Sequence, residues 1–177
     1  VSESRGLGDV YKRQDPNAPT IYHGQMDVLE SLFQSGERVL GYENWTQGWD
    51  PAVARTSMDQ ALTKLNNNVQ GVVSSNDGNA GAAVASLAEQ GMDGKVPVSG
   101  LDCTPAALQM ILTGEMTQSV WRDFNLMMES TAKATVALIN GDSLDGIVAG
   151  FSPANSAGAE IPMVPVGFYN AVGEEGV

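Results

Sequence analysis

The chain has 177 residues, a formal net charge of −12 and 42% hydrophobic residues. This length allows one well-packed domain and little more, and the negative charge argues against direct binding to nucleic acid phosphates or anionic lipid. No apolar run approaches the roughly eighteen residues of a transmembrane helix. Cys103 is the only cysteine and His23 the only histidine, which excludes an internal disulfide and a zinc site built from these residue types.

Residues 1–14 differ from the rest of the chain. Their sequence, VSESRGLGDVYKRQ, shares neither periodicity nor composition with the residues after it and resembles a translated adaptor or linker. We therefore expect this segment to be non-native and base the fold prediction on the chain from Asp15 onward.

Short β-branched runs alternate with helical stretches after Asp15. Apolar residues recur at helical spacing in five stretches, which predict helices at residues 24–35, 51–65, 78–90, 104–114 and 123–141. Strands are predicted at residues 38–42, 69–73, 95–99 and 117–121, with a late strand at 161–166. Pro97 argues for an edge or end position within its strand. The alternation predicts an α/β fold, a parallel sheet with helices on both faces.

Polar and aromatic side chains follow the carboxyl ends of the predicted strands, where open parallel sheets bind their ligands. Trp49 comes after the first strand, Asn76 after the second, Asp102 after the third and Arg122 after the fourth. A carboxylate, an amide and a guanidinium offer acceptors and donors to hydroxyl groups. An indole face can cover the C–H side of a sugar ring. This edge therefore suits an uncharged, polyhydroxylated ligand.

Each of these residues also has a purely structural interpretation. Helix starts are marked by Asp50, Asp77 and Asp123, which we expect to be caps rather than ligand contacts. Asn76 can shape its turn, and Asp102 and Arg122 can form an ordinary ion pair. Trp45 and Trp121 can simply pack, and so can Trp49. The gathering of the candidates on one edge is what favours a binding site.

No catalytic motif accompanies these residues. The chain lacks a G-x-S-x-G elbow, a P-loop and an H-E-x-x-H motif, and the glycine-containing turn at 75–81 lacks the G-x-G-x-x-G spacing. A Cys103 nucleophile would need His23, which is predicted at the start of a distant helix. We expect no catalytic residue, no cofactor and no metal site.

Two long strings closely resemble periplasmic xylose-binding proteins: NNNVQGVVSSND at residues 66–77 and ASLAEQGMDGKVPVSGLD at residues 85–102. The resemblance runs from about residue 15 to residue 141 and includes Trp45-x-x-Gly-Trp49. These proteins have two α/β lobes that close on a sugar and deliver it to an ABC transporter. The resemblance implies the type I fold of periplasmic binding proteins, here as a truncated C-terminal lobe.

The resemblance also implies roles for the candidate residues. Trp49 would stack on the sugar, and Asn76 and Asp102 would bind its hydroxyl groups. Arg122 stands where the family usually has a lysine, which keeps the charge but changes the donor geometry. The implied ligand is xylose or a related aldose. The implied partners are a transporter permease and a chemoreceptor, and the implied location is the periplasm or, with an anchor, the outer cell surface.

The resemblance divides the chain into three parts after the first 14 residues. Residues 15–122 would form the sugar-binding lobe, residues 123–150 a helix that packs on the missing N-terminal lobe, and residues 151–177 a return segment and tail. Two other functions stay open. One is the sugar-sensing domain of a Lac-repressor-type regulator, which has the same two-lobed core, and the other is a small α/β enzyme.

Overall fold

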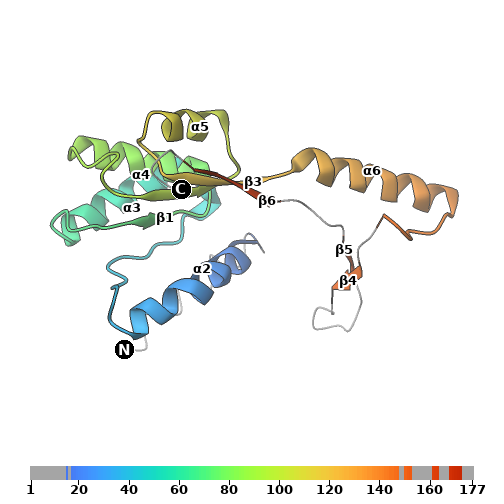
Figure 1. Cartoon of the computed structure of the whole chain (residues 1–177), viewed down its shortest axis with the longest axis horizontal. Helices are drawn as coiled ribbons and strands as arrows, with labels where there is room; N and C mark the ends of the chain where they lie inside the picture. Colours follow the sequence, from blue (N-terminus) through green and yellow to red (C-terminus); the bar gives the residue numbers. More distant parts are fainter. Residues whose placement is uncertain (1–14, 16, 148–149, 153–160, 164–167, 173–177) are drawn as a thin grey trace. The chain divides into compact units, whose positions relative to one another are not determined.

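The computed structural model describes residue 15 and residues 17–147, 150–152, 161–163 and 168–172 (Figure 1). The expected adaptor at residues 1–14 lies outside the described residues. The chain divides into two compact units, with breaks between Val120 and Trp121 and between Tyr169 and Asn170. The first break lies two residues before the boundary expected after residue 122, and the roles expected for the parts stay predictions.

A parallel sheet forms the centre of the first unit. Strands β1 (Val72–Val73), β2 (Val98–Leu101) and β3 (Gln118–Arg122) are hydrogen-bonded neighbours in that order, and both pairings are parallel. Gly100 of β2 lies opposite Ser119 of β3. Strand β6 (Phe168–Val172) follows β3 in the sheet order. The predicted α/β class with a parallel sheet is confirmed.

Helices α3 (Pro51–Lys64), α4 (Asp77–Glu89) and α5 (Pro105–Leu112) lie close to the predicted positions, and each begins at a capping side chain. The Asp50 carboxylate accepts a hydrogen bond from the Ala52 N–H at 2.9 Å, as predicted. The Thr104 hydroxyl accepts from the Ala107 N–H at 3.3 Å. Such side chains satisfy backbone N–H groups that have no partner within the helix.

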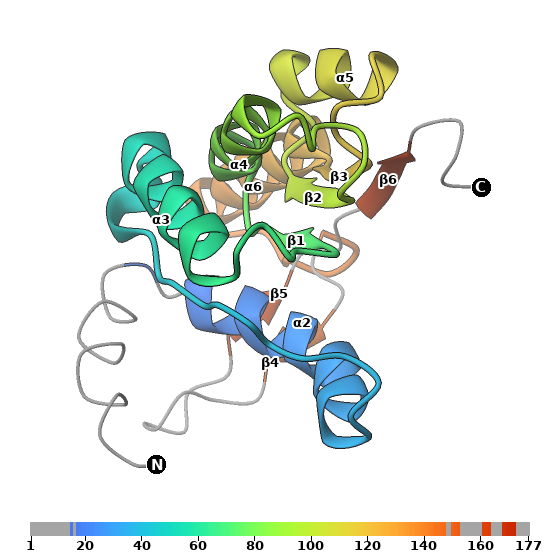
Figure 2. The ribbon, with the colours of Figure 1, turned by 90° about the vertical axis from the view of Figure 1, so that its left-hand side faces the viewer.

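The core of the first unit lies around α4, which packs against α3, α5 and β2 (Figures 1 and 2). Ala80 and Leu87 of α4 and Val98 of β2 are fully buried. The core cluster contains Met58, Leu62, Ala80, Ala83, Val84, Leu87, Val96, Val98, Ala107, Ile111 and Met116. Pro97 directly precedes β2, which agrees with the expected end position, and its carbonyl accepts from the Val72 N–H at 2.8 Å.

The segment before α3 departs most from the sequence prediction. Helix α2 (Asn17–Gln34) starts seven residues earlier than expected, with the Asp15 carboxylate accepting from the Asn17 N–H at 2.8 Å. The strand predicted at residues 38–42 is wrong, because this segment has no strand structure. It lies against the end of α3 instead, where a Cβ on Gly41 would be 3.0 Å from the Leu65 methyl groups. A segment of strand-like composition forms a strand only where it pairs with a strand edge.

The second unit contains α6 (Phe124–Asn140) and the antiparallel strands β4 (Gly150–Ser152) and β5 (Ile161–Met163). Asp123 caps α6 as predicted, accepting from the Leu126 N–H at 2.9 Å. Gly141, with φ of 75°, ends the helix, as glycine does in the left-handed conformation. The late strand is confirmed at Ile161–Met163, and residues 164–166 of that prediction lie outside the described residues.

Among the described residues, no helix combines the length and the hydropathy that crossing a membrane requires.

Candidate functional site

Asn76 lies between β1 and α4 and caps that helix. Its Oδ1 atom accepts from the Asn79 N–H at 2.8 Å, and the Ser74 hydroxyl donates to its carbonyl oxygen at 3.0 Å. The cap uses the oxygen of the amide, so the Nδ2 amino group is the atom that can donate to a ligand. Asn76, and not Asp77 as predicted, is therefore the capping residue of α4.

Asp102 begins a strained turn between β2 and α5. Its φ is 112° and that of Cys103 is 51°, a region of backbone conformation that non-glycine residues seldom adopt. The Asp102 N–H donates to the Val120 carbonyl at 2.8 Å. The Cys103 N–H donates to the Ser119 hydroxyl at 3.0 Å, and the Thr104 N–H donates to the Asp77 carboxylate at 2.6 Å. All three backbone N–H groups of the turn are thus hydrogen-bonded.

Trp49 is the last residue of the short helix η1 (Gln47–Trp49), and it also has a positive φ, of 57°. Its indole N–H donates to Oδ2 of Asp15 at 2.6 Å. The same carboxylate caps α2 through its other oxygen. Asp15 therefore fixes the edge of the indole by a charge-assisted hydrogen bond, which is stronger than a neutral one. The ring is half-buried.

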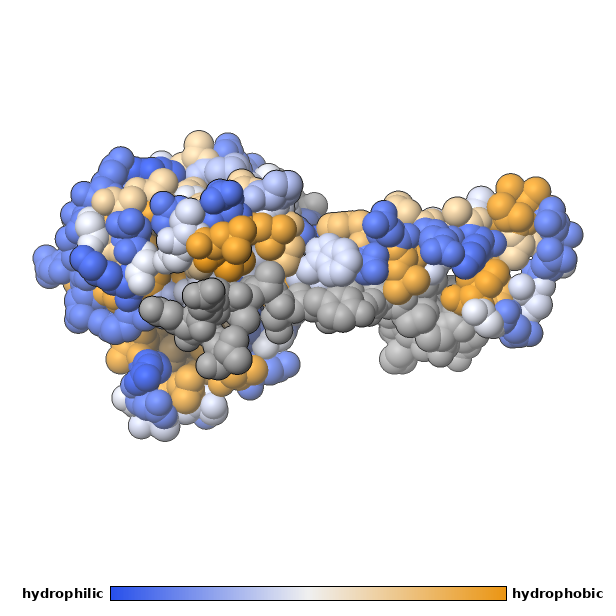
Figure 3. Space-filling model, turned by 45° about the horizontal axis from the view of Figure 1, so that its top comes forward, coloured by the Kyte–Doolittle hydropathy of each residue, from blue (hydrophilic) through white to orange (hydrophobic). Residues whose placement is uncertain are grey.

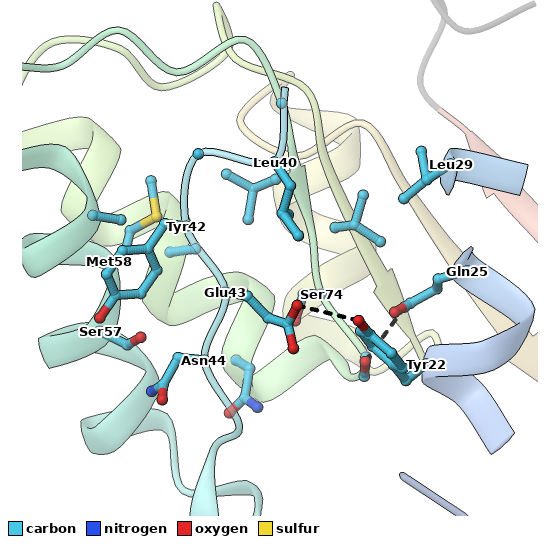
Figure 4. Close-up of a pocket in the computed structure, with 18 of the residues that line it drawn as sticks. Tyr22, Gln25, Leu29, Leu40, Tyr42, Glu43, Asn44, Ser57, Met58 and Ser74 are labelled. Carbon is cyan, nitrogen blue, oxygen red and sulfur yellow. Dashed lines mark hydrogen bonds between the residues drawn. The ribbon is translucent and has the colours of Figure 1, made fainter. Parts of the chain in front are cut away.

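Trp49 lines a cavity of about 1480 Å³ in the first unit, whose walls come from α2, the segment before α3, α3 itself and β1. Figure 4 shows Tyr22 and Gln25 of α2 facing Glu43 and the residues after β1. The Tyr22 hydroxyl donates to Glu43 at 3.2 Å, and Gln25 donates to the Ser75 hydroxyl at 3.3 Å. Partial burial, and then the negative charge of Glu43, raise the pKa of Tyr22.

The structure brings only part of the predicted site together. Asn76 and Asp102 follow neighbouring parallel strands, but neither lines the cavity that contains Trp49. Arg122 is the last residue of β3, the parallel neighbour of β2, and its guanidinium lies 5.1 Å from the ring centroid of Phe124. The four-residue site therefore stays a prediction. The described residues contain no group of His, Cys, Asp and Glu side chains that could hold a metal ion.

Trp45 was expected to pack, and its contacts are partly polar. Its indole N–H donates to Glu43 at 3.0 Å, and its ring lies 5.0 Å from that of Tyr22 at an interplanar angle of 52°.

The sequence prediction also missed the hydrogen bond that the Ser119 hydroxyl donates to the Asp77 carboxylate. A serine in the middle of a predicted strand, together with an aspartate directly after a capping asparagine, was the available signal.

A parallel sheet with helices packed on it and polar groups beyond its carboxyl edge is the architecture of an α/β ligand-binding lobe. The chain matches the periplasmic binding protein domain family over residues 11–143, and it belongs to this family. It is 39% identical over 127 residues to the D-xylose-binding periplasmic protein of Escherichia coli (strain K12). It is 36% identical over 131 residues to the D-xylose-binding periplasmic protein of Haemophilus influenzae.

These two matches cover 72% and 74% of this chain but 38% and 40% of the relatives, so the chain spans about two fifths of their length. Solved structures agree with the type I periplasmic-binding-protein fold. An ABC transporter solute-binding protein from Clostridium phytofermentans, with bound β-D-glucose, has a TM-score of 0.73 at 22% identity. That similarity covers 87% of this chain and 50% of the other.

Proposed function

We propose that this chain is the C-terminal lobe of a solute-binding protein that captures a monosaccharide between two lobes and delivers it to an ABC transporter. The observation that carries the proposal is the 39% identity over 127 residues to a D-xylose-binding periplasmic protein. The chemistry of the candidate residues supports it, because an amide, a carboxylate and an indole suit the hydroxyl and C–H faces of a sugar. Xylose or a related aldose is the ligand that we propose.

The same relatives support a transport role over the two other functions. They are sugar-binding proteins rather than enzymes, and their names place them in the periplasm. We therefore propose that the protein performs no chemistry and acts in the periplasm or, with an anchor, at the outer cell surface. Its partners would be a transporter permease and a chemoreceptor.

A chimaera tests the proposal directly. Residues 15–177 would replace the corresponding part of the Escherichia coli D-xylose-binding periplasmic protein, which supplies the first lobe. Titration calorimetry with D-xylose, D-ribose, D-glucose and D-galactose should then give binding that is tightest for one aldose. A folded chimaera that binds none of these sugars would contradict the proposal, and turnover of any of them would favour an enzyme.

A further inference from the structure

The most buried acidic side chain among the described residues is one that the proposed sugar site does not use. Asp77 is 3% exposed and lies in the first turn of α4. Its Oδ1 atom accepts from the Ser119 hydroxyl at 2.6 Å, and its Oδ2 atom accepts from the Thr104 N–H at 2.6 Å. The partial positive charge at a helix N-terminus favours a carboxylate there. The carboxylate thus links α4 to β3 and to the turn after β2.

The Ser119 hydroxyl extends this link. It donates its hydrogen to Asp77 and accepts from the Cys103 N–H at 3.0 Å, and Ser119 itself is completely buried. Two of the three N–H groups in the turn of residues 102–104 therefore depend on Asp77, one directly and one through Ser119. Strained backbone persists only where its surroundings determine it, and this turn contains the positive φ angles of Asp102 and Cys103.

Gly100 leaves the space that the link needs. A Cβ atom on Gly100 would collide with Oδ1 of Asp77 and with Cε of Met116. Gly100 lies two residues before Asp102, the first residue of the strained turn, and opposite Ser119 in the sheet. Asp77 thus provides the acceptor, the Ser119 hydroxyl connects it to the turn, and Gly100 leaves the space that the Asp77 carboxylate occupies.

We propose that Asp77 is a positioning residue for the sugar site: its buried carboxylate holds the turn of residues 102–104 and so sets the direction of the Asp102 carboxylate. This inference rests on the proposed function, in which Asp102 binds sugar hydroxyl groups. Asp77 itself contacts no sugar in this scheme. Its hydrogen-bond partners lie on β3 and on the turn, so we expect its effect to reach the ligand mainly through Asp102.

The position of Asp77 requires a carboxylate, because a neutral amide cannot accept hydrogen bonds with both of its polar atoms. Asp77 accepts two hydrogen bonds, one with each oxygen. In Asp77→Asn, one of the two positions would hold an NH₂ group, which donates and cannot accept. If the amide oxygen faced the Thr104 N–H, the Ser119 hydroxyl would lose its acceptor. Asp77→Asn should therefore weaken the link, and Asp77→Ala should remove it.

Amide hydrogen exchange of the 177-residue chain, followed by NMR, tests the link itself. In Asp77→Ala, the amides of Cys103 and Thr104 should exchange at least about tenfold faster than in the parent, since each loses its support. In Ser119→Ala, the acceleration should be confined to Cys103. Asp59→Ala removes an exposed helical carboxylate and serves as the matched control, which should change neither amide. Unchanged exchange at both amides in a folded Asp77→Ala or Asp77→Asn variant overturns the inference.

A double-mutant cycle tests whether the link acts through Asp102. Binding of D-xylose to the chimaera, followed by ligand-observed NMR, should weaken by about tenfold in Asp77→Asn but not further when Asp102→Ala is already present. Equal losses in both backgrounds would mean a general structural role and would overturn the positioning role. If the parent chimaera binds none of the four aldoses, the proposed function fails, and the exchange data on the 177-residue chain still decide whether Asp77 holds the turn.

Discussion

Helices α4 and α6 are both rich in apolar residues, yet they bury very different parts of their surfaces. In α4, Ala80 and Leu87 are fully buried, and five other residues of the helix are buried with them. In α6, all of whose residues are described, Ala137 is the only buried residue. Leu138 and Ile139 next to it are 65% and 78% exposed. Apolar spacing predicts a helix, but burial requires a second surface.

The two helices differ in the size of the side chains that they present to their surroundings. Helix α4 has small residues that allow close approach, and a Cβ on Gly81 would lie only 3.2 Å from Cε of Met110 in α5. Helix α6 instead presents large apolar side chains, namely Phe124, Leu126, Met128, Val136, Leu138 and Ile139. Figure 3 shows this apolar surface on the part of the chain that forms α6. That α6 packs on another lobe stays a prediction.

Truncating one leucine on each helix is the strongest test of the comparison. Leu87→Ala should lower the free energy of unfolding by about 2–5 kcal/mol, because the cavity that it leaves is fully enclosed. Leu138→Ala, the matched control, should change it by less than about 0.5 kcal/mol. Urea unfolding followed by circular dichroism measures both. Equal losses at the two positions would show that α6 is buried in solution.

Adding a methyl group to a glycine tests the same contrast between a packed position and an open one. Gly100→Ala should destabilise the chain by about 1–3 kcal/mol, since its Cβ has no space beside Asp77 and Met116. Gly24→Ala, in α2, meets nothing within 4 Å. It should stabilise by up to about 1 kcal/mol through helix propensity. The same sign for both variants in thermal unfolding would contradict this packing.

Substitutions of Asp102 and Arg122 should also have different effects on sugar binding. In the chimaera, Asp102→Ala should cost more than the roughly 0.5–1.5 kcal/mol of a neutral hydrogen bond, because a carboxylate with two acceptor oxygens is lost. Arg122→Lys keeps the charge and should retain binding, with a changed ranking of pentoses and hexoses. Trp45→Ala is the control and should act mainly on stability. If calorimetric titration shows that the Asp102→Ala variant binds sugar as tightly as the parent chimaera, the proposed site is excluded.

The sequence predicted the helices and the parallel sheet well, because periodicity, capping residues and flanking glycines are local signals. Asp50 and Asp123 are caps as expected. The strand at residues 38–42 was wrong, because strand formation depends on a distant edge that the local pattern does not contain. Asp77 was misread as a cap for the same reason: its partners, Thr104 and Ser119, lie 27 and 42 residues away in the sequence.

The exposed side of α6 should bind a hydrophobic dye. Changing this surface should have the smallest effect on stability, because folding hardly depends on exposed side chains. Contiguous exposed apolar side chains on a folded chain favour binding of such dyes and self-association. Replacing both Leu138 and Ile139 by lysine should lower the fluorescence of bound anilinonaphthalene sulfonate and leave the unfolding midpoint unchanged. Leu112→Lys removes one apolar side chain of α5 that is 83% exposed, and it should leave the dye signal nearly unchanged. A chain that stays monomeric by light scattering and binds no dye would mean that the apolar residues of α6 are covered in solution.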